Sequence, residues 1–257
     1  MARLLAAELL MTYVNFRRYP LETGVAWLLQ CAFLAAVGLG TGYYNRVAGN
    51  PLPLENPLLG YLLWTYAAMC IDLAAFNVAR EAQTGTLEQY LLNGHPPALL
   101  VTTKLVASLF STTVLVGSVL AVMSKVFGAR LSLGGVALLV IVLTLVGVIG
   151  LGLMLAGVVV VYKRASTLGT VLQISLLFLT GAIVPLEMIS PVLASTASVL
   201  PLTLGIRLLR EVTLSGQVSS ALVAALAANS AAYLAGGVLV FNRMDAVARR
   251  RGLLGHY

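Results

Sequence analysis

Residues 134–162, GGVALLVIVLTLVGVIGLGLMLAGVVVVY, decide the fold class of this chain. The run carries no charge and is longer than the roughly 20 apolar residues that cross a bilayer as a helix. Across all 257 residues, 60% are hydrophobic and only 10% are charged, whereas an average soluble domain carries roughly 25% charged residues. This composition excludes soluble enzymes and DNA-binding proteins, so the net charge of +7 does not indicate a nucleic-acid partner.

Five further apolar runs have the length of a span: 23–42, 58–79, 98–123, 168–184 and 219–241. The sequence therefore predicts an all-α integral membrane protein with six transmembrane helices in a single domain, 1–257. Glycines recur within these runs and let helix backbones approach closely, as in a tight bundle or a dimer. They are Gly38, Gly42, Gly147, Gly150, Gly152 and Gly157.

The basic residues predict the orientation of the chain. With six spans, both termini lie on one side, and that side holds eleven of the Lys and Arg residues against five on the other. Because cytoplasmic loops carry the excess of basic residues, both termini and the tail 242–257 are expected in the cytoplasm. The expected location is the cytoplasmic membrane of a bacterium or archaeon.

Residues 1–22 form an amphipathic segment before the first span. Glu8, Thr12, Asn15 and Arg18 recur at helical spacing and make one polar stripe, while the other faces are apolar. This pattern is typical of a helix that lies in the headgroup plane. A cytosolic helix packed on a partner is the alternative.

Several kinds of site are excluded because the residues that they require are missing or wrongly spaced. None of Lys104, Lys125 and Lys163 follows a glycine, so the chain has no P-loop for ATP. His95 and His256 have no metal-ligand spacing, and no catalytic constellation is present. The two cysteines lie in apolar runs and are expected to be buried thiols rather than a disulfide.

The segment 80–97, REAQTGTLEQYLLNGHPP, predicts a short, separately capped helix between the second and third spans. Gly85 breaks the preceding helix, and Thr86 with Gln89 forms a capping box. Asn93 and Gly94 then supply a C-terminal stop. The alternative is a tight turn that only connects two spans.

Two motifs resemble those of the ABC-2-type permeases, the membrane subunits of many bacterial ATP-driven exporters. The first is E-x-x-x-G-T-[hydrophobic]-E, carried here by Glu81, Gly85, Thr86, Leu87, Glu88 and Gln89. The second is the outer-face signature of that family, carried by residues 181–187, which include Pro185 and Glu187, by residues 200–203, which include Pro201, and by Arg207 and Arg210. One departure is Leu200, where the family often has Asn.

The resemblance implies a mechanism and partners. Two permease chains in membrane lipid, here expected as a homodimer or as a heterodimer with a similar chain, would pair with two separate ABC ATPase subunits. Those subunits would bind ATP and Mg, so this chain would hold no cofactor and be no enzyme itself. The helix after the second span would dock on the ATPase, with Glu88, Tyr90 and Leu91 facing it. Residues 185–217 would dip into the membrane as a re-entrant segment, against a plain outer loop as the alternative.

The expected function is export of a lipophilic or amphipathic molecule such as a drug or a lipid. Phe33, Phe76 and Phe178 in or beside the spans favour such a cargo. Within the same family, a lipid-linked polysaccharide or a haem-related cargo is the alternative. An ion-coupled secondary transporter is a further alternative, although only Asp72 lies well inside a span.

Asp72 and Lys104 are the two charges within neighbouring spans. Asp72 precedes Arg80 by eight residues and Lys104 follows Pro97 by seven, so at 1.5 Å per residue both lie about 11 Å inside the same end of the bundle. We expect them to form an ion pair, because an unpaired charge at that depth is costly. The alternatives are that Lys104 reaches the interface alone and that Asp72 faces a wet cavity.

Overall fold

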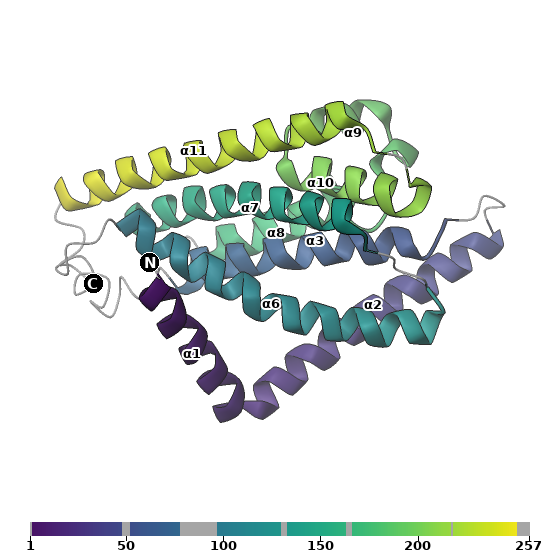
Figure 1. Cartoon of the computed structure of the whole chain (residues 1–257), viewed down its shortest axis with the longest axis horizontal. Coiled ribbons are helices and arrows are strands. Elements are labelled where there is room, and N and C mark those ends of the chain that lie inside the picture. The colour runs from purple at the N-terminus through teal and green to yellow at the C-terminus, as the bar shows by residue number, and fades with distance from the viewer. Residues whose placement is uncertain are drawn as a thin grey trace.

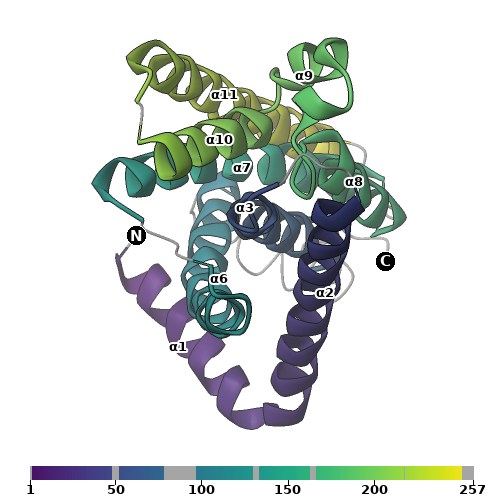
Figure 2. The same cartoon turned by 90° about the vertical axis from the view of Figure 1, so that its right-hand side faces the viewer.

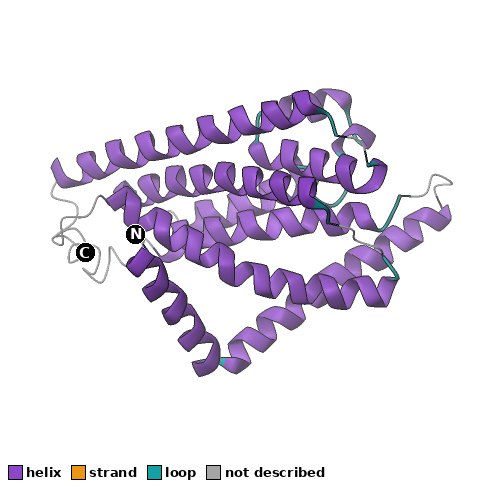
Figure 3. Ribbon diagram, viewed as in Figure 1, coloured by secondary structure: helices purple, strands orange, loops and turns teal. Residues whose placement is uncertain are grey.

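The computed structural model describes residues 2–47, 52–77, 97–129, 133–162, 166–216 and 218–250, and every regular element in these ranges is helical (Figure 3). The long helices run side by side as a bundle, and residues 191–210 lie at one end of it (Figure 1). The chain is thus an all-α integral membrane protein, as its composition predicts.

Five described helices are long and apolar enough to cross a membrane. They are α2 (Pro20–Val47), α3 (Glu55–Asp72), α6 (Pro97–Phe127), α7 (Gly135–Val161) and α11 (Ser220–Arg250). Each corresponds to a predicted span. The predicted tail 242–257 begins inside α11, which continues without a break to Arg250.

The predicted fifth span, 168–184, is wrong in extent. Its helix α8 (Ser166–Leu179) has 14 residues, about 21 Å at 1.5 Å per residue, against a hydrocarbon core of about 30 Å. The chain turns at Gly181, whose φ of +71° is a conformation that favours glycine. Pro185 then precedes the short helix η2 (Leu186–Met188).

The segment after α8 folds back on itself. The helices α9 (Pro191–Ala197) and α10 (Pro201–Arg210) begin at prolines, and α10 continues as the π-helix η3 (Glu211–Ser215). The two arms meet at an angle of 117°. If this bent pair counts as one span, the candidate spans number six; a re-entrant loop has the same geometry. The bent pair lies within residues 185–217, where the sequence predicts a re-entrant segment.

The centre of the bundle is α3, which Figure 2 shows end-on among its neighbours. Nearly all of α3 is buried, and it packs against α2, α6, α7, α8 and α10. At its end, the π-helix η1 (Leu73–Asn77) continues the chain. The predicted helix within 80–97 lies outside the described residues.

The close helix packing that the glycines predict occurs within one chain, between α7 and α11. A Cβ on Gly150 would overlap the backbone at Tyr233, and one on Gly237 would overlap the backbone of Gly150. A Cβ on Gly157 would come within 2.9 Å of the Cα of Phe241. Small residues therefore set this helix–helix distance. By contrast, Gly42 has open space beside it.

The N-terminal segment forms the helix α1 (Ala2–Arg18), which packs on α6 and turns into α2 at Tyr19 (Figure 1). Leu10, Met11, Tyr13 and Val14 on α1 are exposed. An exposed apolar surface of this kind fits a helix that lies in the headgroup plane.

Candidate functional site

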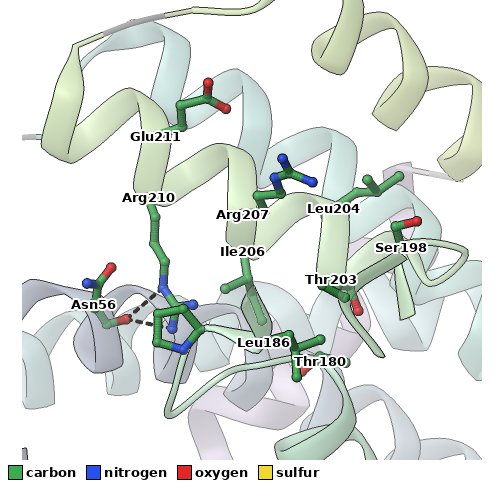
Figure 4. Close-up of a pocket in the computed structure, with 12 residues that line it drawn as sticks. Asn56, Thr180, Leu186, Ser198, Thr203, Leu204, Ile206, Arg207, Arg210 and Glu211 are labelled. Carbon is green, nitrogen blue, oxygen red and sulfur yellow. Dashed lines mark hydrogen bonds between the residues drawn. The ribbon is translucent and has the colours of Figure 1, made fainter. Parts of the chain in front are cut away.

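A cavity of about 330 Å³ lies where α10 meets α9 and the start of α3 (Figure 4). Its wall combines hydroxyl groups, two guanidinium groups, one carboxylate and apolar side chains. The polar members are Asn56, Thr180, Ser198, Thr203, Arg207, Arg210 and Glu211. One face of α10 supplies Thr203, Arg207 and Arg210, because residues three and four apart share a side of a helix.

Arg210 ties this region together. It is 9% exposed, and its Nε and Nη2 donate to the carbonyl oxygen of Asn56 at 3.1 and 3.0 Å. Nη2 also donates to the carbonyl oxygen of Ala182 at 3.0 Å. Figure 4 shows the side chain reaching from α10 towards Asn56. A buried guanidinium bound to main-chain carbonyls holds α10, α3 and the turn after α8 in one arrangement.

The same turn lies directly on α3. A Cβ on Gly60 would overlap the carbonyl group of Ala182, so only glycine permits this approach. On the far side of α10, a Cβ on Gly147 would come within 2.5 Å of the Cβ of Pro201. Both sides of the site are therefore fixed by close packing.

A second, more apolar cavity of about 300 Å³ lies on the other side of residues 183–188. It is lined by α2 and by the turn after α8: Val37, Gly40, Thr41, Tyr44, Leu52, Pro57, Ile183, Val184 and Met188. Asn56 and Pro57, adjacent in the chain, line the two different cavities. A polar cavity and an apolar cavity thus flank one short segment.

The comparison with protein families gives a match to the ABC-2 type transporter model over residues 6–214, which is most of the chain. This chain belongs to the ABC-2 type transporter family. It is therefore the permease subunit of an ABC transporter, a multi-pass membrane protein whose family implies an ABC ATPase partner. The comparison with curated proteins gave no match.

The residues of the permease's outer motif come together only in part. Pro185, Arg207 and Arg210 line the polar cavity, whereas Pro201 packs against α7. Glu187 lies in η2, and its side chain is outside the described part of the structure. The residues predicted to couple to the ATPase are also outside the described residues: Glu81, Gly85, Thr86, Leu87, Glu88, Gln89, Tyr90 and Leu91.

The structure does not form the predicted ion pair between Asp72 and Lys104. The Asp72 carboxylate instead accepts from Nε2 of Gln173 on α8, at 2.6 Å. The same Nε2 donates to the carbonyl oxygen of Ala68 at 2.9 Å, and Nε1 of Trp64 donates to the carbonyl oxygen of Gln173 at 3.1 Å. Equal depth in two helices does not decide which way each side chain points, and the side chain of Asp72 meets Gln173 on α8.

Sequence reasoning missed Asn56 and Thr180 as parts of the site, and it placed Thr203 in the second motif without giving it a role. Asn56 acts through its main-chain carbonyl, so its side chain carries no signal of the role. Thr180 and Thr203 are ordinary residues of apolar segments. Thr180 is 2% exposed and Thr203 is 7% exposed, and only the structure shows that both residues lie beside a cavity.

Proposed function

We propose that this permease exports a lipophilic or amphipathic molecule, such as a drug or a lipid, from the cytoplasm or the inner leaflet. In this proposal it forms a homodimer with a second copy and binds two ABC ATPase subunits, on which ATP and Mg reside. Both termini lie on the cytoplasmic side of a bacterial or archaeal cytoplasmic membrane. The family match supports the ATPase partner, and the basic-residue asymmetry supports the orientation.

The position of α3 carries the proposal. One end of α3 leads through η1 to Asn77, three residues before the segment 80–97 that resembles an ATPase-docking helix. The other end carries Asn56, whose carbonyl oxygen accepts from Arg210 in α10. One buried helix thus connects the expected ATPase side with the bent pair α9–α10, so movement at one end is transmitted to the other.

The described surface supports an apolar cargo. Phe33, Phe76 and Phe178 are 37%, 44% and 64% exposed. The apolar cavity beside residues 183–188 offers a second apolar surface near the bent pair. Apolar side chains with a few polar groups are typical of a site for an amphipathic ligand.

A lipid-linked sugar is the second candidate cargo, and an aromatic cluster favours it. The rings of Phe33 and Tyr61 stack with centroids 5.7 Å apart, and Trp64 joins them at 6.2 Å from Phe33. Only Phe33 of the three is substantially exposed, since Tyr61 is 3% exposed. Helix packing accounts for most of this cluster, so the lipophilic cargo remains the first proposal.

The test is cargo-stimulated ATP hydrolysis by the reconstituted complex. The permease and its ATPase are placed in proteoliposomes, and drugs, phospholipids and glycolipids are added in turn. Stimulation by drugs or phospholipids is expected. Stimulation by glycolipids alone would favour the second candidate, and a complex with one permease chain per ATPase dimer would contradict the homodimer.

A further inference from the structure

The corner between α1 and α2 projects from the bundle, and Figures 1 and 2 both show it apart from the other helices. On α1, the apolar side chains of Leu10, Met11 and Val14 are exposed. Arg17 and Arg18 follow Val14 by three and four residues, in the last turn of the helix. Residues at this spacing share one side of a helix. An exposed apolar stripe on α1 therefore ends in two arginines.

The two arginines carry the charge of this corner. Both are exposed, and neither has a hydrogen bond or an ion pair with any residue that the structure describes. The guanidinium carbon of Arg18 lies 5.9 Å from the centre of the exposed Tyr19 ring, within the range of a cation–π contact. Glu22 is the only carboxylate between residues 9 and 54. The corner is therefore positively charged, with two guanidinium groups open to a negatively charged partner.

The apolar surface continues from α1 onto α2. Leu21 is 84% exposed, and Val25 and Leu28, which follow it at helical spacing, are exposed as well. Because α2 is long and apolar enough to cross a membrane, its exposed side faces acyl chains and its first turn lies at the membrane surface. The two arginines just before that turn then lie at the level of the headgroups. This continuity with a lipid-facing span favours a lipid over a cytosolic protein as the partner of the corner.

We propose that the α1–α2 corner binds an anionic phospholipid in the leaflet where α2 begins. The apolar stripe of α1 enters the boundary between headgroups and acyl chains. Arg17 and Arg18 donate to the phosphate oxygens, which guanidinium groups bind through two parallel hydrogen bonds. A zwitterionic headgroup balances its phosphate internally, whereas an anionic one keeps a net negative charge for the arginines. The proposal concerns a lipid held at the surface of the permease, and it holds whatever the cargo or the direction of transport.

The test is a titration of the purified full-length permease in a neutral detergent, with the bound lipids counted by native mass spectrometry. The probes are dioleoyl phosphatidylglycerol, which is anionic, and dioleoyl phosphatidylcholine, which is zwitterionic and has the same acyl chains. The double change Arg17→Gln with Arg18→Gln is expected to weaken binding of phosphatidylglycerol about 25-fold, because each arginine near an anionic surface contributes about fivefold. Binding of phosphatidylcholine should change less than about twofold, since that headgroup has no net charge.

Two further pairs of changes serve as controls. Arg17→Lys with Arg18→Lys keeps both charges, so binding of phosphatidylglycerol should stay within about threefold of wild type. Arg243→Gln with Arg250→Gln removes two exposed arginines from α11. No large apolar side chain is exposed among residues 240–250, all of which the structure describes. This α11 pair should therefore change binding of phosphatidylglycerol less than about threefold, because it lacks the apolar stripe that anchors the lipid at the corner.

The apolar stripe is tested separately. Met11→Ser with Val14→Ser should weaken binding of both lipids about tenfold, because apolar burial does not distinguish headgroups. The proposal is overturned if the glutamine pair at the corner binds phosphatidylglycerol as tightly as the α11 pair does. It is also overturned if that glutamine pair loses both lipids equally, since the arginines would then act only on the fold. Normal binding of phosphatidylglycerol together with a lost ATPase subunit would show that the corner faces a protein, and would overturn it as well.

Discussion

The helices α2 and α3 have similar hydropathy, but α2 is mostly exposed and α3 is mostly buried inside the protein. Each contains an 18-residue stretch that is apolar enough to cross a membrane. Yet 11% of that stretch is buried inside the protein in α2 and 78% in α3. Hydropathy separates lipid from water, but it does not separate lipid from protein, because both are apolar. The exposed faces of α2 are therefore left for lipid or for a second permease chain.

The two helices also differ in their polar contacts. α3 contributes the carbonyl oxygen of Asn56 to Arg210 and the Asp72 carboxylate to Gln173. In α2, Trp27 donates to Ser118 on α6, while Oε1 of Gln30 is buried without a partner among the described residues. Equivalent substitutions in or against the two helices should thus have unequal effects.

Glycine positions should show the largest difference. Gly60→Ala places a Cβ against the carbonyl group of Ala182, which cannot move without breaking the turn after α8. We expect a loss of about 3 kcal/mol of stability. Gly42→Ala, on α2, has open space and is expected to be neutral or stabilising. Thermal unfolding in nanodiscs measures both, and equal midpoints would contradict the described packing.

Arginine positions follow. Arg210→Met leaves the carbonyl oxygens of Asn56 and Ala182 without this donor, so we expect a loss of about 2 kcal/mol. Arg46→Met removes an exposed guanidinium at the end of α2 and should cost less than about 0.5 kcal/mol. The comparison uses the same unfolding assay. A midpoint for Arg210→Met that equals that of Arg46→Met would mean that Arg210 does not hold α10 to α3.

Glutamine positions give a smaller difference. Gln173→Leu removes the hydrogen bond to Asp72, and we expect a loss of about 1 kcal/mol. Gln30→Leu removes an orphan buried oxygen and should be neutral or stabilising. If Gln173→Leu is neutral while Lys104→Met destabilises the protein, Asp72 depends on Lys104 rather than on Gln173.

The smallest effect is expected at Trp27. Trp27→Phe loses the bond from Nε1 to Oγ of Ser118, at 2.9 Å, and should cost about 0.5 kcal/mol. Ser118→Ala loses the same bond. The double variant should then be less destabilised than the sum of the two single changes, and strict additivity would show that the bond contributes nothing.

The sequence predicts those parts of the fold in which the residue pattern of one helix is enough to locate that helix. Apolar runs of span length locate α2, α3, α6, α7 and α11, and prolines mark the starts of α9 and α10. The prediction of a fifth straight span is wrong because Gly181 and Pro185 end the helix inside an apolar run. Periodicity and hydropathy do not register a turn that is itself apolar.

The site depends on contacts between distant parts of the chain, and these were harder to predict. Arg210 was identified by its motif, but its partners are main-chain atoms of Asn56 and Ala182. Asp72 was expected to meet Lys104 by depth alone, whereas Gln173, 101 residues further on, is the residue beside it. The position of a residue along a helix can be predicted from sequence. The direction in which its side chain points depends on how the helix is rotated about its axis, and packing sets that rotation.

The central claim is that ATP hydrolysis on the ATPase moves α3 through the segment 80–97. Measuring ATP-dependent transport in proteoliposomes tests this claim most directly. The wild-type complex is expected to transport in an ATP-dependent way. Glu88→Arg is expected to lower this transport at least about tenfold with an unchanged unfolding midpoint, because it reverses the charge that we propose faces the ATPase. Glu22→Arg, an equal reversal at the start of α2, should transport normally. Undiminished transport by Glu88→Arg, or wild-type transport driven by an ion gradient without ATP, would contradict it.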